Sequence, residues 1–313
     1  MKLDPINPAP PVTNRRRMRT GYTYSMRGIL LAGGMGTRLN PITQTVNKHL
    51  IPIYDKPMVY YPLTTLILAG VKDICLVSTE DGVGQFNRLL SNGNQWGLNI
   101  TYAVQKEAIG IANGIEIALQ TYKSNEPTLV ILGDNIFYGL GLGRNISEVD
   151  GNDECMIWTQ KVDNPEFFGI LKLGDNNEIK VIVEKPLDGV GDLAITGLYY
   201  FPKDLREIVG KGSKSPRGEY EITEILNFYL TEKRIINENL SRGVYWIDAG
   251  TVENLLEVGQ FVRAVQSRQG HLIGSPDEAA WRMGNIADQD LLSLVAKMKD
   301  SEYKAQLKKL VWR

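Results

Sequence analysis

The sequence predicts an α/β protein: a Rossmann-like, three-layer mixed sheet that is mostly parallel, with inserted antiparallel strands and a C-terminal helical segment. Short apolar runs at 28–31, 74–78, 100–104 and 129–132 alternate with helix-like segments at 58–69, 85–90 and 111–122. The apolar residues in these runs are continuous, which is typical of parallel strands covered by helices on both faces.

The second half of the chain has a different pattern, which predicts the antiparallel strands. Beyond residue 150, strand-like runs follow each other closely at 155–160, 169–173, 179–184 and 194–201. A helix at 220–232, strands at 235–239 and 244–247, and tail helices such as 291–299 and 303–310 complete the pattern. We therefore expect a core over 27–250 and a helical segment over 251–313.

Residues 1–26 differ in composition from the rest of the chain. Four prolines crowd the first eleven positions, and Arg15, Arg16, Arg17 and Arg19 follow without the apolar stretch of a secretory signal. This composition predicts a disordered extension, with the folded part beginning near Met26.

Overall composition excludes several classes of function. The net charge of −1 over 313 residues gives no general affinity for nucleic acid or for a membrane surface. No apolar run approaches the ~20 residues of a membrane span. Cys75 and Cys155 lie in apolar runs, which predicts buried reduced thiols and a cytoplasmic location. Two scattered histidines do not make a histidine-based metal site.

The strongest functional signal is the glycine-rich turn directly after the first strand. Gly33, Gly34 and Gly36 let backbone N–H groups approach an anion, and Arg38 and Lys48 add fixed positive charge. This combination suits a polyphosphate, although a glycine-rich turn alone is equally typical of a tight loop.

Two common phosphate-binding loops are excluded by the residues around this turn. The dinucleotide fingerprint needs a third glycine where Leu39 stands. The Walker pattern needs Gly-Lys-Ser/Thr, whereas the chain has Gly36-Thr37-Arg38.

Two aspartates follow apolar strands and suit a divalent cation. Asp134 ends the run 130–134, and Asp248 ends the run 244–248. Each alone is also typical of a turn or a helix cap. Together, two carboxylates from separate strands can share a Mg²⁺ ion that also binds phosphate oxygens.

Charged residues at a third strand end suit a phosphorylated sugar. Lys185 offers a compact positive charge before Pro186, and Glu184 can accept hydrogen bonds from sugar hydroxyls. A Glu-Lys pair before proline is also typical of solvated surface. The stretch 217–223, with Glu221 and Thr223, could face a sugar or simply cap a helix.

Taken in order, these stretches resemble the sugar-phosphate nucleotidyltransferases, specifically the short-form glucose-1-phosphate thymidylyltransferases. The resemblance covers essentially residues 27–313. It is carried by the segments 28–39, 48–61, 95–98, 132–139, 184–186, 196–199, 217–223 and 246–251.

The resemblance implies that a sugar-1-phosphate, here glucose-1-phosphate, attacks the α-phosphorus of dTTP in line and releases pyrophosphate, with Mg²⁺ as cofactor. It implies the catalytic residues Arg38, Lys48 and Lys185, and metal ligation by Asp134 and Asp248. The implied nucleotide-binding residues are Leu31, Gly33, Gly34, Gly36, Thr37, Arg38, Gln105, Gly110 and Asp134. The implied sugar-phosphate-binding residues are Asn135, Gly169, Glu184, Lys185 and Tyr199. The core 27–250 would then contain a nucleotide half and a sugar-phosphate half, and the C-terminal helices would help to build a homotetramer.

Several positions depart from the family pattern and leave alternatives open. The segment 106–109 reads Lys-Glu-Ala-Ile where the family has Pro-Ser-Pro-Asp, so a uridylyltransferase or an enzyme for another hexose-1-phosphate is the nearest alternative. His49, Phe168 and Leu140 replace a glutamine, a tyrosine and a histidine, the last at a second nucleotide site used for feedback inhibition. A non-catalytic sugar-nucleotide-binding subunit predicts loss of charged residues that are all present. A nicotinamide oxidoreductase is disfavoured by Leu39.

Overall fold

A nine-stranded mixed sheet forms the centre of the protein. The computed structural model describes residues 26–187 and 189–311. The strands of the large sheet are β1 (Arg27–Leu31), β4 (Asp73–Ser78), β5 (Asn99–Val104), β6 (Thr128–Leu132), β8 (Cys155–Lys161), β9 (Gly169–Leu173), β10 (Ile179–Glu184), β11 (Leu193–Phe201) and β12 (Ile235–Asn239). Two small sheets contain β2 (Pro52–Ile53) with β3 (Lys56–Pro57), and β7 (Asn135–Tyr138) with β13 (Tyr245–Asp248).

The order of the strands separates a parallel part from an antiparallel part. The main path is β10-β9-β11-β6-β1-β4-β5, and β8 joins β11 to β12. Strands β6, β1, β4 and β5 pair in parallel, whereas β11 runs antiparallel to β6, β8 and β9. This confirms the predicted mixed sheet with inserted antiparallel strands.

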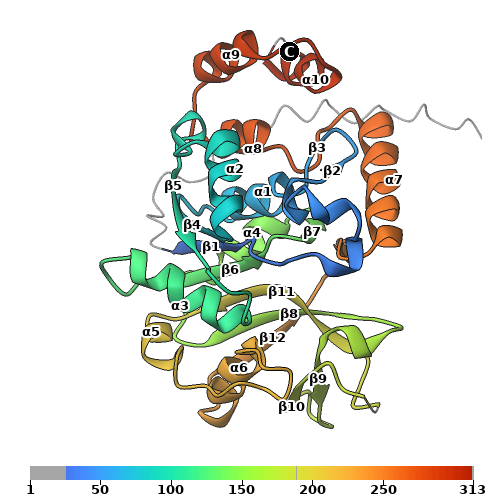
Figure 1. The fold of residues 1–313 in the computed structure, drawn as a ribbon. Helices are drawn as coiled ribbons and strands as arrows, with labels where there is room; N and C mark the ends of the chain where they lie inside the picture. The colour runs from blue at the N-terminus through green and yellow to red at the C-terminus, as the bar shows by residue number, and fades with distance from the viewer. Residues whose placement is uncertain (1–25, 188, 312–313) are drawn as a thin grey trace, which may run out of the picture.

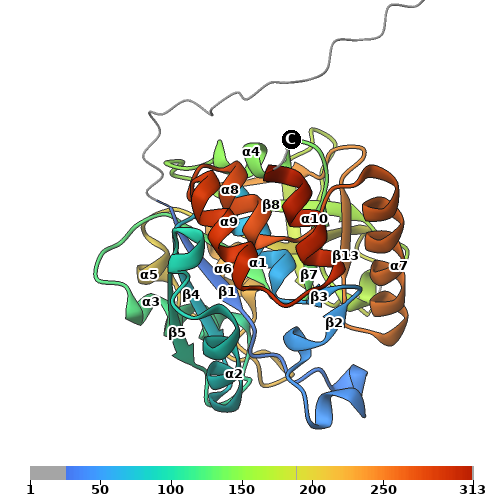
Figure 2. The same ribbon diagram turned by 90° about the horizontal axis from the view of Figure 1, so that it is seen from above.

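Helices cover the sheet on both faces and extend the C-terminal part. They are α1 (Tyr60–Leu68), α2 (Glu80–Leu90), α3 (Ile111–Thr121), α4 (Leu142–Ser147), α5 (Leu205–Ile208), α6 (Ile222–Thr231), α7 (Val252–Gln269), α8 (Pro276–Arg282), α9 (Asp288–Lys297) and α10 (Glu302–Val311). In Figure 1, α1, α2 and α8 lie above β1 and β6, whereas α3, α5 and α6 lie below these two strands. Figure 2 shows α8, α9 and α10 gathered over α1.

The two cores follow from the alternation of side chains along each strand. On β1, Leu30 packs with the cluster that contains Leu63 and Leu66 of α1. Its neighbour Ile29 packs with the opposite cluster, which contains Ile115 of α3 and Leu226 of α6. Both faces of the strand are therefore apolar, which explains its continuous apolar sequence.

The sequence places most helices and strands correctly and misplaces some of their ends. Helix α2 begins at Glu80 rather than near Gln85, because the Thr79 side chain accepts a hydrogen bond from Gly82 N at 3.2 Å and caps the helix. Gly82 and Gly84 inside its first turns conceal this start, since glycine weakens the helical signal.

The predicted disordered extension lies outside the described residues except for Met26, which is buried in the core beside α1. The division at residue 250 stays a prediction. Over the described part of the chain, no helix is long and apolar enough to span a membrane.

Candidate active site

The glycine-rich loop lies at the carboxyl end of β1, as predicted. Gly34, Thr37 and Arg38 are exposed, whereas Gly33 is buried. Gly36 has a φ of 63°, and a Cβ there would lie 2.8 Å from Thr43 Cγ2 and 3.1 Å from Lys48 Cβ. Glycine is therefore required at position 36 for both its backbone angle and its close packing on Lys48.

Lys48, which is buried, and Asp134, which is partly buried, form an ion pair next to this loop. The short helix Lys48–Leu50 carries Lys48, whose ammonium Nζ donates to Asp134 Oδ2, and the lysine is 7% exposed. Burial opposes ionisation of Asp134, but the Lys48 charge and hydrogen bonds from Lys48 and Asn135 hold its pKa well below the usual value. The Asp134 carboxyl therefore stays ionised.

His49 packs beneath the glycine loop and is neutral. Its backbone N donates to Asn47 Oδ1 at 2.9 Å, and its Nδ1 lies 3.1 Å from the same oxygen. Burial and the neighbouring Lys48 charge lower its pKa to about 4. With this pKa the imidazole carries no charge at neutral pH, and its Nδ1 faces the Asn47 side-chain oxygen.

Asp248 joins the same site through the small β7–β13 sheet. It pairs in register with Asn135, and Ala249 N donates to Asp134 O at 2.9 Å, so the backbones of both aspartates are neighbours. Arg38 Nη2 lies 3.6 Å from Asp248 Oδ2, whereas Asp248 Oδ1 is buried with no hydrogen-bond partner among the described residues. Burial and the charge of Asp134 raise the pKa of Asp248 to about 6.

Asn135 is held by two internal hydrogen bonds. Its Nδ2 donates to Asp134 Oδ1 at 2.9 Å, and its Oδ1 accepts from Trp246 Nε1 at 2.7 Å. The Trp246 ring packs on Phe168 with centroids 5.4 Å apart. Asn135 therefore orients Asp134, and Trp246 is a site residue that the sequence-based list omitted although it precedes Asp248 by two positions.

Gln105 and Gly110 lie together beside the glycine loop. Gln105 Nε2 donates to Gly110 O at 3.1 Å, and Gln105 Oε1 is 2.8 Å from where a Cβ would stand on Gly33. Leu31 closes the same region from β1, since its Cδ2 lies 3.0 Å from the corresponding position on Gly114. The four residues of this region that were predicted to bind the nucleotide therefore lie together: Leu31, Gly33, Gln105 and Gly110.

Gly110 requires glycine for its backbone conformation. Its φ is 117°, and a Cβ would lie 2.3 Å from Tyr220 O. We expect Gly110→Ala to destabilise the protein by more than about 1–3 kcal/mol. That range is the cost of the backbone strain alone, and the Tyr220 backbone must also move. Chemical denaturation measures this. The control is Gly84→Ala, an exposed position of α2 with nothing within 4 Å of the new Cβ, where stability should be unchanged or higher.

A second group of charged residues lies at the ends of β9 and β10. Lys185 adopts a φ of 43°, its backbone N donates to Phe168 O at 2.9 Å, and its Nζ lies 3.9 Å from Glu184 Oε1. Glu184 Oε2 lies 3.4 Å from the Cβ position of Gly169, which is ordinary van der Waals contact, so Gly169 lies directly against the carboxylate.

Arg217 connects this group to the start of α6. Its Nη1 lies 3.8 Å from Glu184 Oε1 and 3.4 Å from Glu221 Oε1. Burial and the Glu221 charge raise the pKa of Glu184, while Lys185 and Arg217 act in the opposite direction. The sequence-based list omitted Arg217, whose signal was its place in the segment 217–223.

Strand β11 contacts both groups of charged residues. A Cβ on Gly197 of β11 would lie 2.9 Å from Asn135 Cγ, and Ile195 Cδ1 on the same strand is 3.7 Å from the Cβ position of Gly169. Tyr199, also on β11, is buried, and burial raises its pKa, with smaller contributions from the charges of Glu184 and Asp134. Strand β11 therefore joins the part of the chain around Asn135 to the part around Gly169.

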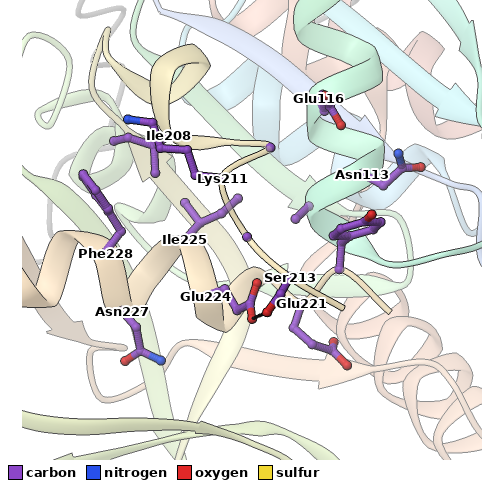
Figure 3. Close-up of a pocket in the computed structure, with 14 residues that line it drawn as sticks. Asn113, Glu116, Ile208, Lys211, Ser213, Glu221, Glu224, Ile225, Asn227 and Phe228 are labelled. Carbon is purple, nitrogen blue, oxygen red and sulfur yellow. Dashed lines mark hydrogen bonds between the residues drawn. The ribbon is translucent and has the colours of Figure 1, made fainter. Parts of the chain in front are cut away.

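A cavity of about 500 Å³ lies beside this site, between α3 and α6 (Figure 3). Asn113 and Glu116 of α3 border it on one side, and Glu221 and Glu224 border it on the other. Its walls include residues that contact Gln105 and Arg217, so it adjoins both halves of the site.

Comparison with known proteins places this geometry in a family. The profile of the nucleotidyl transferase family matches residues 27–265, which is most of the chain. The chain belongs to the nucleotidyl transferase family. The match covers the glycine loop, both aspartates and the Lys185 group.

Two relatives of this nucleotidyl transferase have the same name. Glucose-1-phosphate thymidylyltransferase of Mycobacterium tuberculosis is 43% identical over 92% of this chain and 100% of its own length. That of Neisseria meningitidis serogroup A is 38% identical over 91% of this chain and 99% of its own length.

Two solved structures share the fold of this chain. A Bacillus anthracis structure described as a glucose-1-phosphate thymidylyltransferase in complex with a sucrose has a TM-score of 0.70 and 34% identity. The match covers 76% of this chain and 95% of that one. A UDP-glucose pyrophosphorylase complexed with UDP-glucose has a TM-score of 0.66 and 25% identity, over 76% of this chain and 99% of that one.

Proposed function

We propose that this nucleotidyl transferase is a glucose-1-phosphate thymidylyltransferase, which converts dTTP and α-D-glucose-1-phosphate into dTDP-glucose and pyrophosphate. The observation that carries the proposal is the union of the Lys48–Asp134 and Arg38–Asp248 ion pairs at the glycine loop. The names of relatives that match the chain over nearly its full length support the choice of substrates.

Each part of the site has a role that its chemistry supports. The exposed loop 34–38 receives the triphosphate, and Arg38 and Lys48 neutralise charge on the departing pyrophosphate. Lys185 holds the phosphate of the sugar, whose oxygen is already ionised and needs no general base. Glu184 accepts hydrogen bonds from sugar hydroxyls. Catalysis then depends on placing the two phosphates in line and on electrostatic stabilisation.

Asp134 and Asp248 fit a Mg²⁺ ion. Asp248 Oδ1 is a buried carboxylate oxygen without a hydrogen-bond partner among the residues described, and it lies in the same site as the Asp134 carboxylate. Mg²⁺ is commonly held by one or two carboxylates together with substrate phosphates. The ion supplies charge neutralisation at the α-phosphate when it is bound.

The affinity for Mg²⁺ should depend on pH through Asp248. Its pKa of about 6 means that protons and Mg²⁺ compete for the carboxylate below neutral pH. We expect the Mg²⁺ concentration for half-maximal activity to fall as pH rises from about 5 to about 7 and then to level off. Titrations of Mg²⁺ at several pH values check this, and a pH-independent half-maximal concentration would contradict it.

A pyrophosphate-release assay tests the proposed function. Purified protein is incubated with Mg²⁺, glucose-1-phosphate and each of dTTP, UTP, CTP, ATP and GTP in turn. We expect the highest kcat/KM with dTTP, and absence of pyrophosphate with every nucleotide would overturn the proposal. A UTP-using enzyme is the second candidate, because segment 106–109 beside Gln105 is altered and a UDP-glucose pyrophosphorylase shares the fold.

The remaining expectations belong to the same proposal. We infer a cytoplasmic homotetramer in which α7 to α10 contribute contacts between copies. Val252 and Leu256 on α7 are exposed apolar residues, which supports contacts between copies. Cys75 and Cys155 are free and buried, which supports a cytoplasmic location. Sedimentation velocity tests the assembly.

A further inference from the structure

Gln105 is buried beside the glycine loop and has unequal hydrogen bonding at its two amide atoms. It is 8% exposed, and its backbone N donates to Ser78 O at 2.8 Å, which fixes the end of β5. Its Nε2 donates to Gly110 O at 3.1 Å and to Asn113 Oδ1 at 3.1 Å. A side-chain amide nitrogen carries two hydrogens, so both of its donors are used inside the protein.

The orientation of this amide follows from its partners. Gly110 O is a backbone carbonyl, which can only accept, so the Gln105 nitrogen must face it. Within the described ranges no donor reaches Gln105 Oε1, which lies 2.8 Å from the Cβ position of Gly33. The unpartnered oxygen of a buried side chain therefore faces the loop that receives the nucleotide.

We propose that Asn113 is a positioning residue that makes Gln105 an acceptor only, and thereby selects pyrimidine bases that carry a hydrogen on N3. This inference rests on the proposed function, because it assumes that a nucleotide base lies at Gln105. Asn113 stands on the first turn of α3 at the edge of the cavity in Figure 3, where its Oδ1 holds the second hydrogen of Gln105 Nε2.

The selection follows from the hydrogen-bonding pattern of the bases. Thymine and uracil present an N3–H donor, which the Gln105 oxygen can accept. Cytosine presents a lone pair at N3, which would face the same oxygen with no hydrogen between them. Gly110 O holds one hydrogen of the Gln105 amide and Asn113 Oδ1 holds the other, so no N–H is left to be offered to the cytosine lone pair.

The test compares nucleotide preference in three variants of the full chain. Asn113→Ala and Asn113→Leu remove the acceptor, and Asn113→Asp keeps an acceptor of the same shape. Values of kcat/KM are measured for dTTP, UTP and CTP with glucose-1-phosphate and Mg²⁺. We expect the dTTP-to-CTP ratio to fall by about 3- to 10-fold in the first two variants, as for loss of one hydrogen bond. The ratio should stay within twofold of wild type in Asn113→Asp.

The outcomes separate this inference from the proposed function. Wild-type protein without dTTP-dependent pyrophosphate release would overturn the proposed function itself. Active wild-type protein whose dTTP-to-CTP ratio is unchanged in both Asn113→Ala and Asn113→Leu would overturn only the role of Asn113. A purely structural role lowers kcat/KM for all nucleotides equally, which the ratio distinguishes. If one apolar variant does not fold, as judged by thermal melting, the other decides.

Discussion

Replacing Lys48 with methionine should lower kcat/KM by about 10²- to 10³-fold, as expected for losing one charged group that stabilises the transition state. The same change should lower the free energy of unfolding by about 3–5 kcal/mol, because it leaves Asp134 charged and buried without its partner. Lys48 is almost fully buried, so solvent cannot replace the ammonium. Steady-state kinetics and chemical denaturation measure the two effects.

A double variant separates catalysis from stability. Lys48→Met combined with Asp134→Asn removes both charges, so we expect most of the lost stability to return. Activity should remain as low as in the single variant or lower. A Lys48→Met protein that keeps its activity within threefold of wild type would contradict the proposed role of Lys48 in holding the triphosphate.

Replacing Asp248 with asparagine should also lower kcat by about 10²- to 10³-fold, with a higher Mg²⁺ concentration needed for activity. This variant should be as stable as wild type or more stable at pH 8. An unfolded aspartate has a pKa of about 3.9, whereas burial raises the pKa of Asp248 to about 6 in the folded protein. The folded state therefore loses stability as pH rises from about 4 to about 6, and asparagine removes that loss.

The control for this prediction is a matched aspartate outside the site. Asp175 lies exposed in the turn before β10, so Asp175→Asn should change neither kcat nor its dependence on Mg²⁺. A loss of activity together with a lower melting temperature at pH 8 in Asp248→Asn would indicate a structural role instead. Thermal melts at pH 5 and pH 8 distinguish the two explanations.

The sequence was sufficient to predict the large sheet and most of its helices. Continuous apolar runs identify β1, β4, β5 and β6, because strands covered on both faces need apolar residues on both sides. It did not predict β7, since four residues that follow a polar turn carry no periodic signal of their own. The pairing of β7 with β13 is nevertheless what brings Asp248 to Asp134.

The candidate site shows the same division between local and long-range information. The glycines and charges of segment 33–48 are visible in the sequence because they are close together in the chain. The contacts of Arg217 with Glu184, and of Trp246 with Asn135, join residues far apart in sequence. No local pattern specifies such a pair, because each partner alone is typical of ordinary surface or core.

Residue types and their order were thus enough to indicate a phosphate-binding loop, a carboxylate pair and the family that combines them. Folding adds the specific pairings: Lys48 with Asp134, Arg38 with Asp248, and the Gln105 amide with Asn113. These depend on which strands become neighbours and on how deeply each side chain is buried. Burial raises the pKa of Asp248, and the hydrogen bonds to Gly110 and Asn113 set the direction in which the Gln105 amide faces. Those properties belong to the packed molecule, because water screens the same groups in the unfolded chain.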